Sequence, residues 1–165
     1  MKKIIIISLA ILLCFSLTSC KPGETDAREV LDTYLAALNE GSYEAAYDLL
    51  SNFDKTNITL DEFTEWRKVI AEIQKVNSSS VGTKVDFFKN YEYKGAQYKK
   101  AYGYLVTQQL EKAWDIEIGG YNAEEYHIMV GFDENEWKIA LLVIDLPSVT
   151  AQYQRKLDDA KAAAQ

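Results

Sequence analysis

The stretch of sequence that decides the fold is VLDTYLAALNEGSYEAAYDLLS, residues 30–51. In its first half the apolar side chains recur at spacings of one, three and four residues, which is typical of one buried face of a helix. Gly41 then provides a left-handed stop, and Ser42 can cap a second, short helix. The stretch therefore predicts two helices that cross with their apolar faces together.

Capping boxes on both sides of this stretch predict where helices begin. Residues 26–29 (DARE) predict the start of the first helix, because the aspartate and the glutamate can each bond to the backbone of the other. Residues 59–62 (TLDE) predict a third helix, from about residue 60 to residue 76. We expect the polar run 77–80 to end it.

Beyond residue 81 the hydrophobic pattern changes to a period of two, which predicts strands. The pattern predicts a first strand over residues 85–93 and a second, long strand over residues 98–109. Residues 124–132 and 136–145 are the clearest predicted hairpin. The run 136–145 is apolar at nearly every position, so it predicts a central strand covered on both faces. The predicted fold is α+β: N-terminal helices packed on a curved antiparallel sheet of about four strands, with a C-terminal helical tail over residues 147–165.

The first residues of the chain have the layout of an export signal. Lys2 and Lys3 precede an apolar run that reaches Ser19, and its length of roughly 16 residues is short of the ~20 that a membrane-spanning helix needs. Leu17-Thr18-Ser19-Cys20 resembles the lipobox of bacterial lipoproteins, in which the cysteine thiolate takes a diacylglyceryl group before cleavage.

These features predict a lipoprotein signal peptide over residues 1–19 and a lipidated tether over residues 20–25. Fatty acyl chains such as palmitate on Cys20 would hold the protein on the extracytoplasmic side of a membrane in the bacterial cell envelope. The membrane is then a partner through the lipid alone.

The net charge argues against nucleic acid as a partner. Removal of the signal peptide leaves 16 basic and 25 acidic side chains, a formal charge of −9. A domain this acidic is repelled by phosphate backbones, so no nucleic-acid partner is expected. Cys14 and Cys20 are the two cysteines, so the exported domain contains no disulfide and its stability must come from packing.

The string at residues 30–51 resembles the opening helical hairpin of the nuclear transport factor 2-like (NTF2-like) superfamily, and of its bacterial lipoprotein members in particular. The resemblance covers about residues 26–146. It implies a cone in which long antiparallel strands curl around a helical layer. Catalytic members of the superfamily, such as ketosteroid isomerases, polyketide cyclases and scytalone dehydratases, place ionisable side chains in the cone's pocket.

Few residues here suit such chemistry. His127 is the only histidine, and strand alternation puts it on the face opposite Tyr126, which favours a sheet-face residue without a catalytic role. The exported domain offers no free thiol, no set of metal ligands and no Gly-rich phosphate loop. We expect no catalytic residue, cofactor or metal. If the cone holds a pocket, Tyr102, Tyr104 and Tyr126 are the residues expected in its wall.

The leading hypothesis is a lipid-anchored, non-catalytic module that binds a small ligand or an envelope protein. The alternative is a small isomerase- or dehydratase-type enzyme, which requires a buried Asp, His or Tyr that nothing neutralises. A third hypothesis, a subunit of a larger envelope assembly, predicts an exposed apolar patch on the open sheet face.

Overall fold

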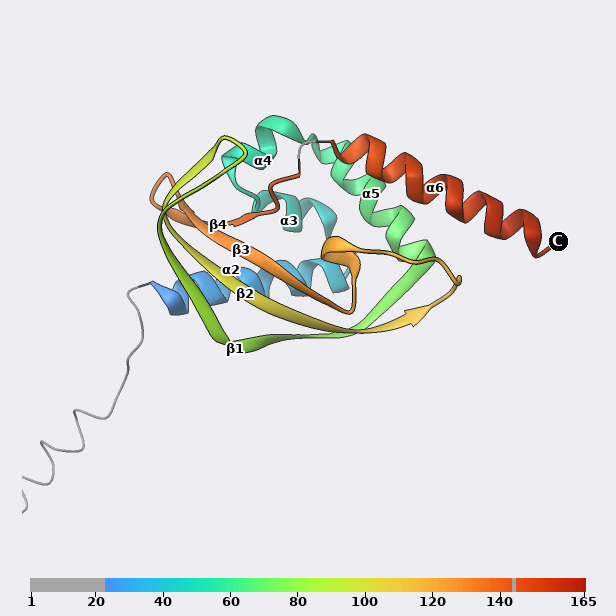
Figure 1. The fold of residues 1–165 in the computed structure, drawn as a ribbon, viewed down its shortest axis with the longest axis horizontal. Helices are drawn as coiled ribbons and strands as arrows, with labels where there is room; N and C mark the ends of the chain where they lie inside the picture. Colours follow the sequence, from blue (N-terminus) through green and yellow to red (C-terminus); the bar gives the residue numbers. More distant parts are fainter. Residues whose placement is uncertain (1–22, 144) are drawn as a thin grey trace, which may run out of the picture.

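The structure, a computed structural model, describes residues 23–143 and 145–165, so the predicted signal peptide and Cys20 lie outside the described part. The chain forms helices first, then a sheet, then a last helix (Figure 1). The helices are α2 (Glu24–Asn39), α3 (Tyr43–Asp48), α4 (Asn52–Asn57), α5 (Leu60–Ile73), the 3-10 helix η1 (Gly120–Asn122) and α6 (Leu146–Ala163). The strands are β1 (Gln74–Tyr93), β2 (Ala96–Lys112), β3 (Glu125–Asp133) and β4 (Glu136–Ala140). This order confirms the predicted fold class.

The four strands form one antiparallel sheet in the order β1-β2-β3-β4. The β1–β2 ladder shifts register twice, between Val76 and Ser78 and between Val81 and Val85. Such irregularities bend a strand and increase its twist. The long hairpin therefore curves, and helices α2, α3 and α5 lie on one side of the sheet (Figure 1).

Alternation along β2 and β3 turns one set of side chains toward the helices and buries it. These residues are Tyr102, Tyr104, Val106, Tyr126, Ile128 and Val130. Burying one large apolar side chain contributes ~1.5–3 kcal/mol. A slip of one residue would turn the whole set to solvent, so burial of this face holds the register.

The capping box predicted for the third helix is present at the start of α5. Thr59 Oγ1 accepts a hydrogen bond from the backbone N–H of Glu62 (3.2 Å), and Glu62 Oε2 accepts one from the backbone N–H of Thr59 (2.8 Å). The helix ends earlier than predicted, because Gln74 adopts an extended backbone (φ −151°, ψ 146°) and opens β1. Residues 77–80 thus belong to a strand and do not end the helix.

The capping box predicted at residues 26–29 is wrong. α2 begins at Glu24 with Gly23 at its N-cap, and no side chain bonds to this end of the helix. Gly23 has a φ of 84°, and a Cβ on it would lie 2.7 Å from the ring of Trp137. The start of this helix therefore depends on a contact with the sheet, and the residues near Gly23 in the sequence do not indicate that contact.

The sequence predicts a central strand of the sheet over residues 136–145. This prediction is wrong about both the length of the strand and its position in the sheet. β4 ends at Ala140 and lies at the edge of the sheet. Its open edge is covered by the chain after α3, where the Ser51 N–H donates to the Ile139 carbonyl (2.8 Å) and the Ile139 N–H donates to the Leu49 carbonyl (2.9 Å). The strand is apolar because this segment covers it, as native sheets commonly cover an edge.

The C-terminal helix α6 lies along α5 (Figure 1). The Asp145 side chain caps it by accepting from the Ser148 N–H (3.1 Å). Leu157 is fully buried in a small cluster with Val69 and Ile73 of α5. None of the helices in the described ranges is both long enough and apolar enough to cross a membrane.

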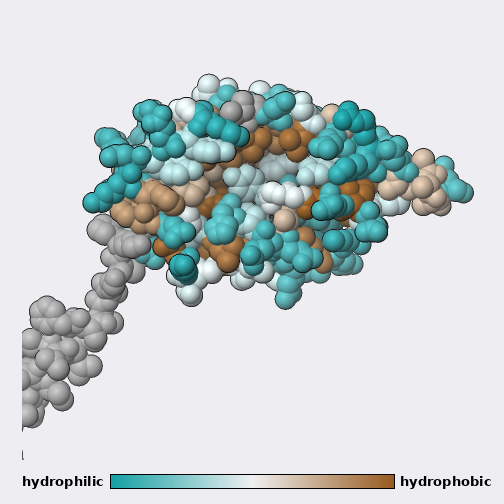
Figure 2. Space-filling model, viewed as in Figure 1, coloured by the Kyte–Doolittle hydropathy of each residue, from teal (hydrophilic) through white to brown (hydrophobic). Residues whose placement is uncertain are grey.

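Hydrophilic side chains cover most of the face shown in Figure 2, where hydrophobic side chains reach the surface in separate areas. Among the described residues the large hydrophobic side chains classed as exposed are Phe88 and Tyr93, 39% and 45% exposed. Single apolar side chains of this kind are common on the surface of folded proteins.

Candidate functional site

The three tyrosines predicted to line a pocket share the inner face of the sheet and lie in the main core. Tyr102, Tyr104 and Tyr126 are 0%, 1% and 7% exposed. The Tyr104 hydroxyl donates to the Glu24 carbonyl (3.2 Å), and Gln108 Nε2 donates to the Tyr126 hydroxyl (3.1 Å). That these rings line a ligand pocket stays a prediction.

A cluster of buried polar side chains lies where α5 meets the start of β1. Arg67 of α5 is only 7% exposed, and its Nη1 donates to Asn122 Oδ1 (2.9 Å). Gln74 Nε2 donates to the Asn122 carbonyl (2.5 Å). These two bonds join η1 to α5 and to the start of β1. The guanidinium also lies 5.0 Å from the centre of the Trp66 ring. We call Arg67, Trp66, Gln74 and Asn122 the Arg67 cluster.

Four side-chain polar atoms in the described part of the chain are buried without a hydrogen-bond partner, and two of them belong to this cluster. The four are Arg67 Nε, Trp66 Nε1, Gln108 Oε1 and Ser79 Oγ. Ser79 and Gln108 are directly opposite each other in the β1–β2 ladder. Buried polar atoms in folded proteins nearly always have a partner, so an unpaired group calls for an explanation such as a ligand or an ordered water.

A hollow of about 260 Å³ opens beside the Arg67 cluster. It lies between the C-terminal end of α2 and the junction of α5 with β1. Its wall is formed by Leu38, Asn39, Glu40, Gly41, Tyr43, Arg67, Ala71, Gln74, Lys75 and Val76.

The charge of Arg67 acts on two buried phenols. Burial raises the pKa of Tyr34, and it raises the pKa of Tyr126 to about 12, while the positive charge of Arg67 opposes both changes. Burial is the larger effect, so both hydroxyls stay protonated at neutral pH. They can donate hydrogen bonds there, but they cannot act as bases.

Asp54 of α4 is a fully buried carboxylate with a different role. Its Oδ2 accepts from Ser51 Oγ (2.8 Å) and from the Leu141 N–H (2.9 Å), and its Oδ1 accepts from the Leu142 N–H (2.8 Å). Burial raises the pKa of Asp54 above its ordinary value, and these hydrogen bonds oppose only part of that rise. Because both oxygens bind the backbone after β4, Asp54 holds that segment against α4.

The only histidine among the described residues lies apart from these groups. His127 is exposed on the outer face of β3, as strand alternation predicts. Among the residues that the structure describes, no group of three His, Cys, Asp or Glu side chains could hold a metal ion.

A family model described as the NTF2-like N-terminal transpeptidase domain matches residues 26–142. The chain belongs to this family. No curated protein and no solved structure matches the chain with significance. The NTF2-like match includes all four strands and leaves out α6. An NTF2-like domain fits a ligand-binding or protein-interaction module, which supports the coarser part of the functional hypothesis.

Sequence reasoning missed the Arg67 cluster of this NTF2-like domain, although a signal for it exists. Phe63, Arg67 and Ile70 are spaced by four and then three residues, so Arg67 occupies the apolar face of α5. A charged residue on that face indicates a buried cation. Asp54 carries no such signal, because it belongs to a polar helix of six residues whose partners are 87 and 88 positions away.

Unfolding at alkaline pH tests whether the buried tyrosines of the NTF2-like domain have raised pKa values. Burial raises the pKa of Tyr98 and of Tyr126 to about 12, whereas an unfolded tyrosine ionises near pH ~10. A tyrosine with a higher pKa in the folded state stabilises the fold fully at pH values below its unfolded pKa. This contribution is lost as pH rises from the unfolded pKa toward the folded pKa. We expect the free energy of unfolding, measured with urea, to fall above pH ~10.

The matched variant is Tyr126→Phe, which removes one of these protons. Above pH ~10 the free energy of unfolding of this variant should decrease less steeply with pH than that of the parent, by up to ~1.4 kcal/mol per pH unit. Tyr93→Phe, at an exposed ring, is the control and should follow the parent protein. An equally steep fall in Tyr126→Phe and in the parent would contradict the raised pKa.

Proposed function

We propose that the protein is a lipoprotein anchored through Cys20 on the extracytoplasmic side of a bacterial membrane, and that its NTF2-like domain is a non-catalytic binding module. Its partner in the envelope would be a small ligand or another protein. The observation that carries this proposal is the lipobox-like sequence Leu17-Thr18-Ser19-Cys20 immediately before a domain of this family.

The short distance between Cys20 and the folded domain supports this assignment. α2 begins at Glu24, four residues after the cysteine, and four extended residues span at most ~14 Å. A domain on so short a tether would stay close to the headgroups. It would present its site to molecules at or near the membrane surface.

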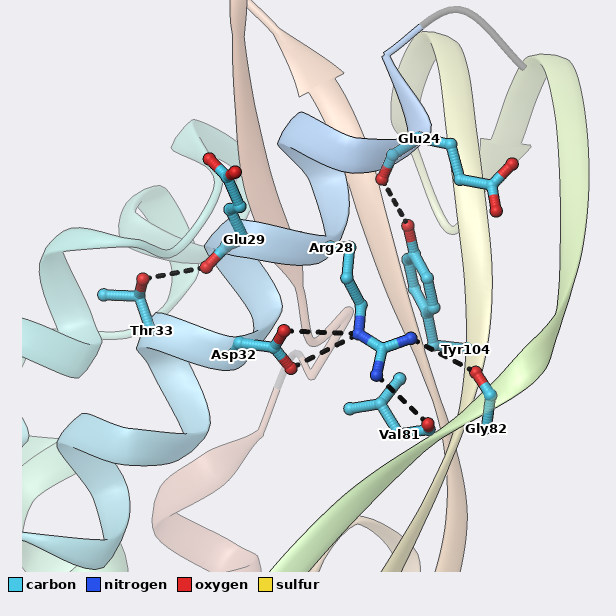
Figure 3. Close-up of polar contacts among 8 residues, drawn as sticks. All are labelled: Glu24, Arg28, Glu29, Asp32, Thr33, Val81, Gly82 and Tyr104. Carbon is cyan, nitrogen blue, oxygen red and sulfur yellow. Dashed lines mark hydrogen bonds and ion pairs between the residues drawn. The ribbon is translucent and has the colours of Figure 1, made fainter. Parts of the chain in front are cut away.

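The first turns of α2 are joined firmly to the sheet, as a short tether requires (Figure 3). Arg28 of α2 donates to the carbonyls of Val81 and Gly82 in β1, at 3.2 and 3.4 Å. Its Nε also bonds to Asp32 one turn later (3.3 Å), and the Tyr104 hydroxyl donates to the Glu24 carbonyl. The helix next to the tether is thus held to β1 and β2 by side-chain bonds.

The chemistry of the buried groups supports binding over catalysis. An isomerase or dehydratase of the NTF2-like kind needs an ionisable group that is free to exchange a proton in the cone. Here the buried carboxylate of Asp54 already accepts hydrogen bonds from two backbone amides and a hydroxyl. Arg67 is a permanent cation, which can hold a ligand but cannot serve as a general base.

Replacing Cys20 with serine tests the anchor. The parent protein should fractionate with membranes, and its mass should show loss of residues 1–19 and gain of a diacylglyceryl group. Cys20→Ser should lack the lipid, because a hydroxyl is not the nucleophile of this reaction. Cys14→Ser, with a cysteine removed from within the apolar run, is the control and should behave like the parent.

Two outcomes would refute the anchor. One is a Cys20→Ser protein that is cleaved and fractionates like the parent. The other is an unmodified sulfur on Cys20 in the parent protein purified from a bacterial membrane fraction.

A further inference from the structure

We propose that the hollow beside Arg67 is a binding site for a carboxylate group, with the Arg67 guanidinium as its anion-binding element. This inference deepens the proposed binding function. It rests on the family's fit to a binding module and does not depend on the lipid anchor.

The first reason is that Arg67 is a buried cation without a counter-ion. No carboxylate lies within salt-bridge distance of it in residues 23–143 and 145–165; the ion pairs found there join other residues. Of the five N–H donors of its guanidinium, one bonds to Asn122, and Nε is buried with no partner. Burial of a charge costs several kcal/mol unless an opposite charge and further hydrogen bonds compensate it.

The neighbours of Arg67 compensate only part of that cost. The contact with the Trp66 ring gives a cation–π attraction. The C-terminal end of α2, which contributes to the same hollow, carries a partial negative charge that favours a cation. A bound anion would supply what is missing, because a charge-assisted bond to a guanidinium is among the strongest hydrogen bonds in proteins.

The second reason is that a hollow large enough for a small anion lies against Arg67. The hollow of about 260 Å³ has Arg67 in its wall, and a liquid water molecule occupies ~30 Å³. The space is slightly smaller than the ~300–1,000 Å³ of pockets for whole drug-sized ligands. It therefore suits a small acid, or the carboxylate end of a larger molecule.

The charges in the wall favour a carboxylate over a phosphate. Glu40 and Lys75 both line the hollow and are exposed, so their opposite charges offset each other. This leaves the positive charge of Arg67, reduced by the partial negative charge at the C-terminal end of α2. A singly charged anion suits that balance better than a doubly charged one. The planar guanidinium also fits the two oxygens of a carboxylate in a bidentate pair.

The rest of the wall indicates what the carboxylate is attached to. Leu38, Ala71 and Val76 contribute apolar surface, and Tyr43 contributes a half-buried ring. A short apolar group next to the carboxylate would pack against these side chains. The ligand class is thus a small organic acid or a chain end with a free carboxylate and an apolar neighbour.

NMR of the full chain in detergent tests this assignment with N-acetylalanine as the probe. Its primary amide, N-acetylalaninamide, is the matched uncharged ligand, and inorganic phosphate is the competing anion. The readout is the ¹⁵N–¹H signal of Arg67 Nε, identified by its loss in Arg67→Gln. We expect the acid to shift this signal saturably, with a dissociation constant of about 1 mM, and we expect the amide to leave it in place.

Variants separate the site from general charge effects. Arg67→Gln should weaken binding of N-acetylalanine at least about tenfold, which corresponds to ~1.4 kcal/mol. Arg155→Gln removes the same charge from an exposed position on α6 and should bind like the parent. Arg67→Lys keeps the charge without the planar donor pair and should bind more weakly than the parent.

The outcomes are distinct from those of the anchor test. No shift of the Arg67 signal by the acid would overturn the site, even in a correctly lipidated protein, and would mean that water alone fills the hollow. A saturable shift with phosphate and none with the acid would overturn the carboxylate assignment. Saturable binding of the acid by a protein that proves unlipidated would support the site and refute only the anchor.

Discussion

Asp54→Ala is expected to lower the free energy of unfolding by about 3–5 kcal/mol, because it leaves buried groups without partners. The N–H groups of Leu141 and Leu142 and the hydroxyl of Ser51 all lose their acceptor. The Tyr98 hydroxyl, which donates to Ser51 Oγ (2.9 Å), is the next member of the same chain of hydrogen bonds. Urea unfolding followed by circular dichroism measures the loss.

The control for this variant is Asp159→Ala, which removes an exposed carboxylate from α6. It should change the stability by no more than about 0.5 kcal/mol. Asp54→Asn should fall between the two, because its one carbonyl oxygen can accept from only part of the set. A loss below about 1 kcal/mol for Asp54→Ala would show that water replaces the carboxylate, and Asp54 would then not be what holds the end of β4.

Gly131→Ala is expected to lower the free energy of unfolding by about 2–3 kcal/mol, the upper part of the usual range for an overpacked core. A Cβ on Gly131 would lie 2.5, 2.7 and 2.9 Å from three atoms of the Tyr98 ring. The ring cannot easily move aside, because its hydroxyl bonds to Ser51 and the ring is 3% exposed. The backbone at Gly131 is also held, because it pairs with Ala101 of β2 and Lys138 of β4.

Gly119→Ala is the matched control, because a Cβ there meets nothing within 4 Å. Its φ of −117° suits any residue, so the change should be neutral, or stabilising by up to ~1 kcal/mol through the unfolded chain. A double-mutant cycle with Tyr98→Ala assigns the cause. Gly131→Ala should cost much less in the Tyr98→Ala background, and an equal cost in both backgrounds would contradict the clash.

These two expectations concern one structural unit, in which β2, β3, α4 and the segment after β4 meet on the outer face of the sheet. The Arg67 cluster lies elsewhere, at the junction of α5 with β1 and η1. Variants of Asp54 and Gly131 should therefore change stability without acting on the hollow directly. A Gly131→Ala protein that remains folded provides a further control for carboxylate binding.

Local sequence was sufficient for the order and type of most elements. Helical spacing placed α2, α3 and α5, and a period of two placed the strands, because each pattern reflects the geometry of its own element. The capping box at Thr59 was correct because all its partners lie within four residues. Strand alternation also placed His127 on the face opposite Tyr126 before the register was known.

Contacts between distant residues account for two of the errors. The apolar run after Glu136 was assigned to the middle of the sheet, because a covered edge strand has the same composition as a central one. The start of α2 was misplaced because Trp137, which packs on Gly23, is more than 100 positions away in the chain. The short helix α4 was missed for another reason: its cap is local, with Ser51 Oγ accepting from the Asp54 N–H (3.2 Å), but its six residues have no apolar stripe.

The sequence by itself determined that this is an α+β chain of the NTF2-like kind, with a lipobox-like cysteine just before the domain, because those features depend on residues close together in the chain. Only the tertiary structure decided which charged groups are buried and what they bond to. Asp54 meets backbone amides that offset part of the cost of its burial, whereas Arg67 meets Asn122 and a hollow. Burial and pairing depend on neighbours from several elements, and that difference makes one group structural and the other the proposed binding element.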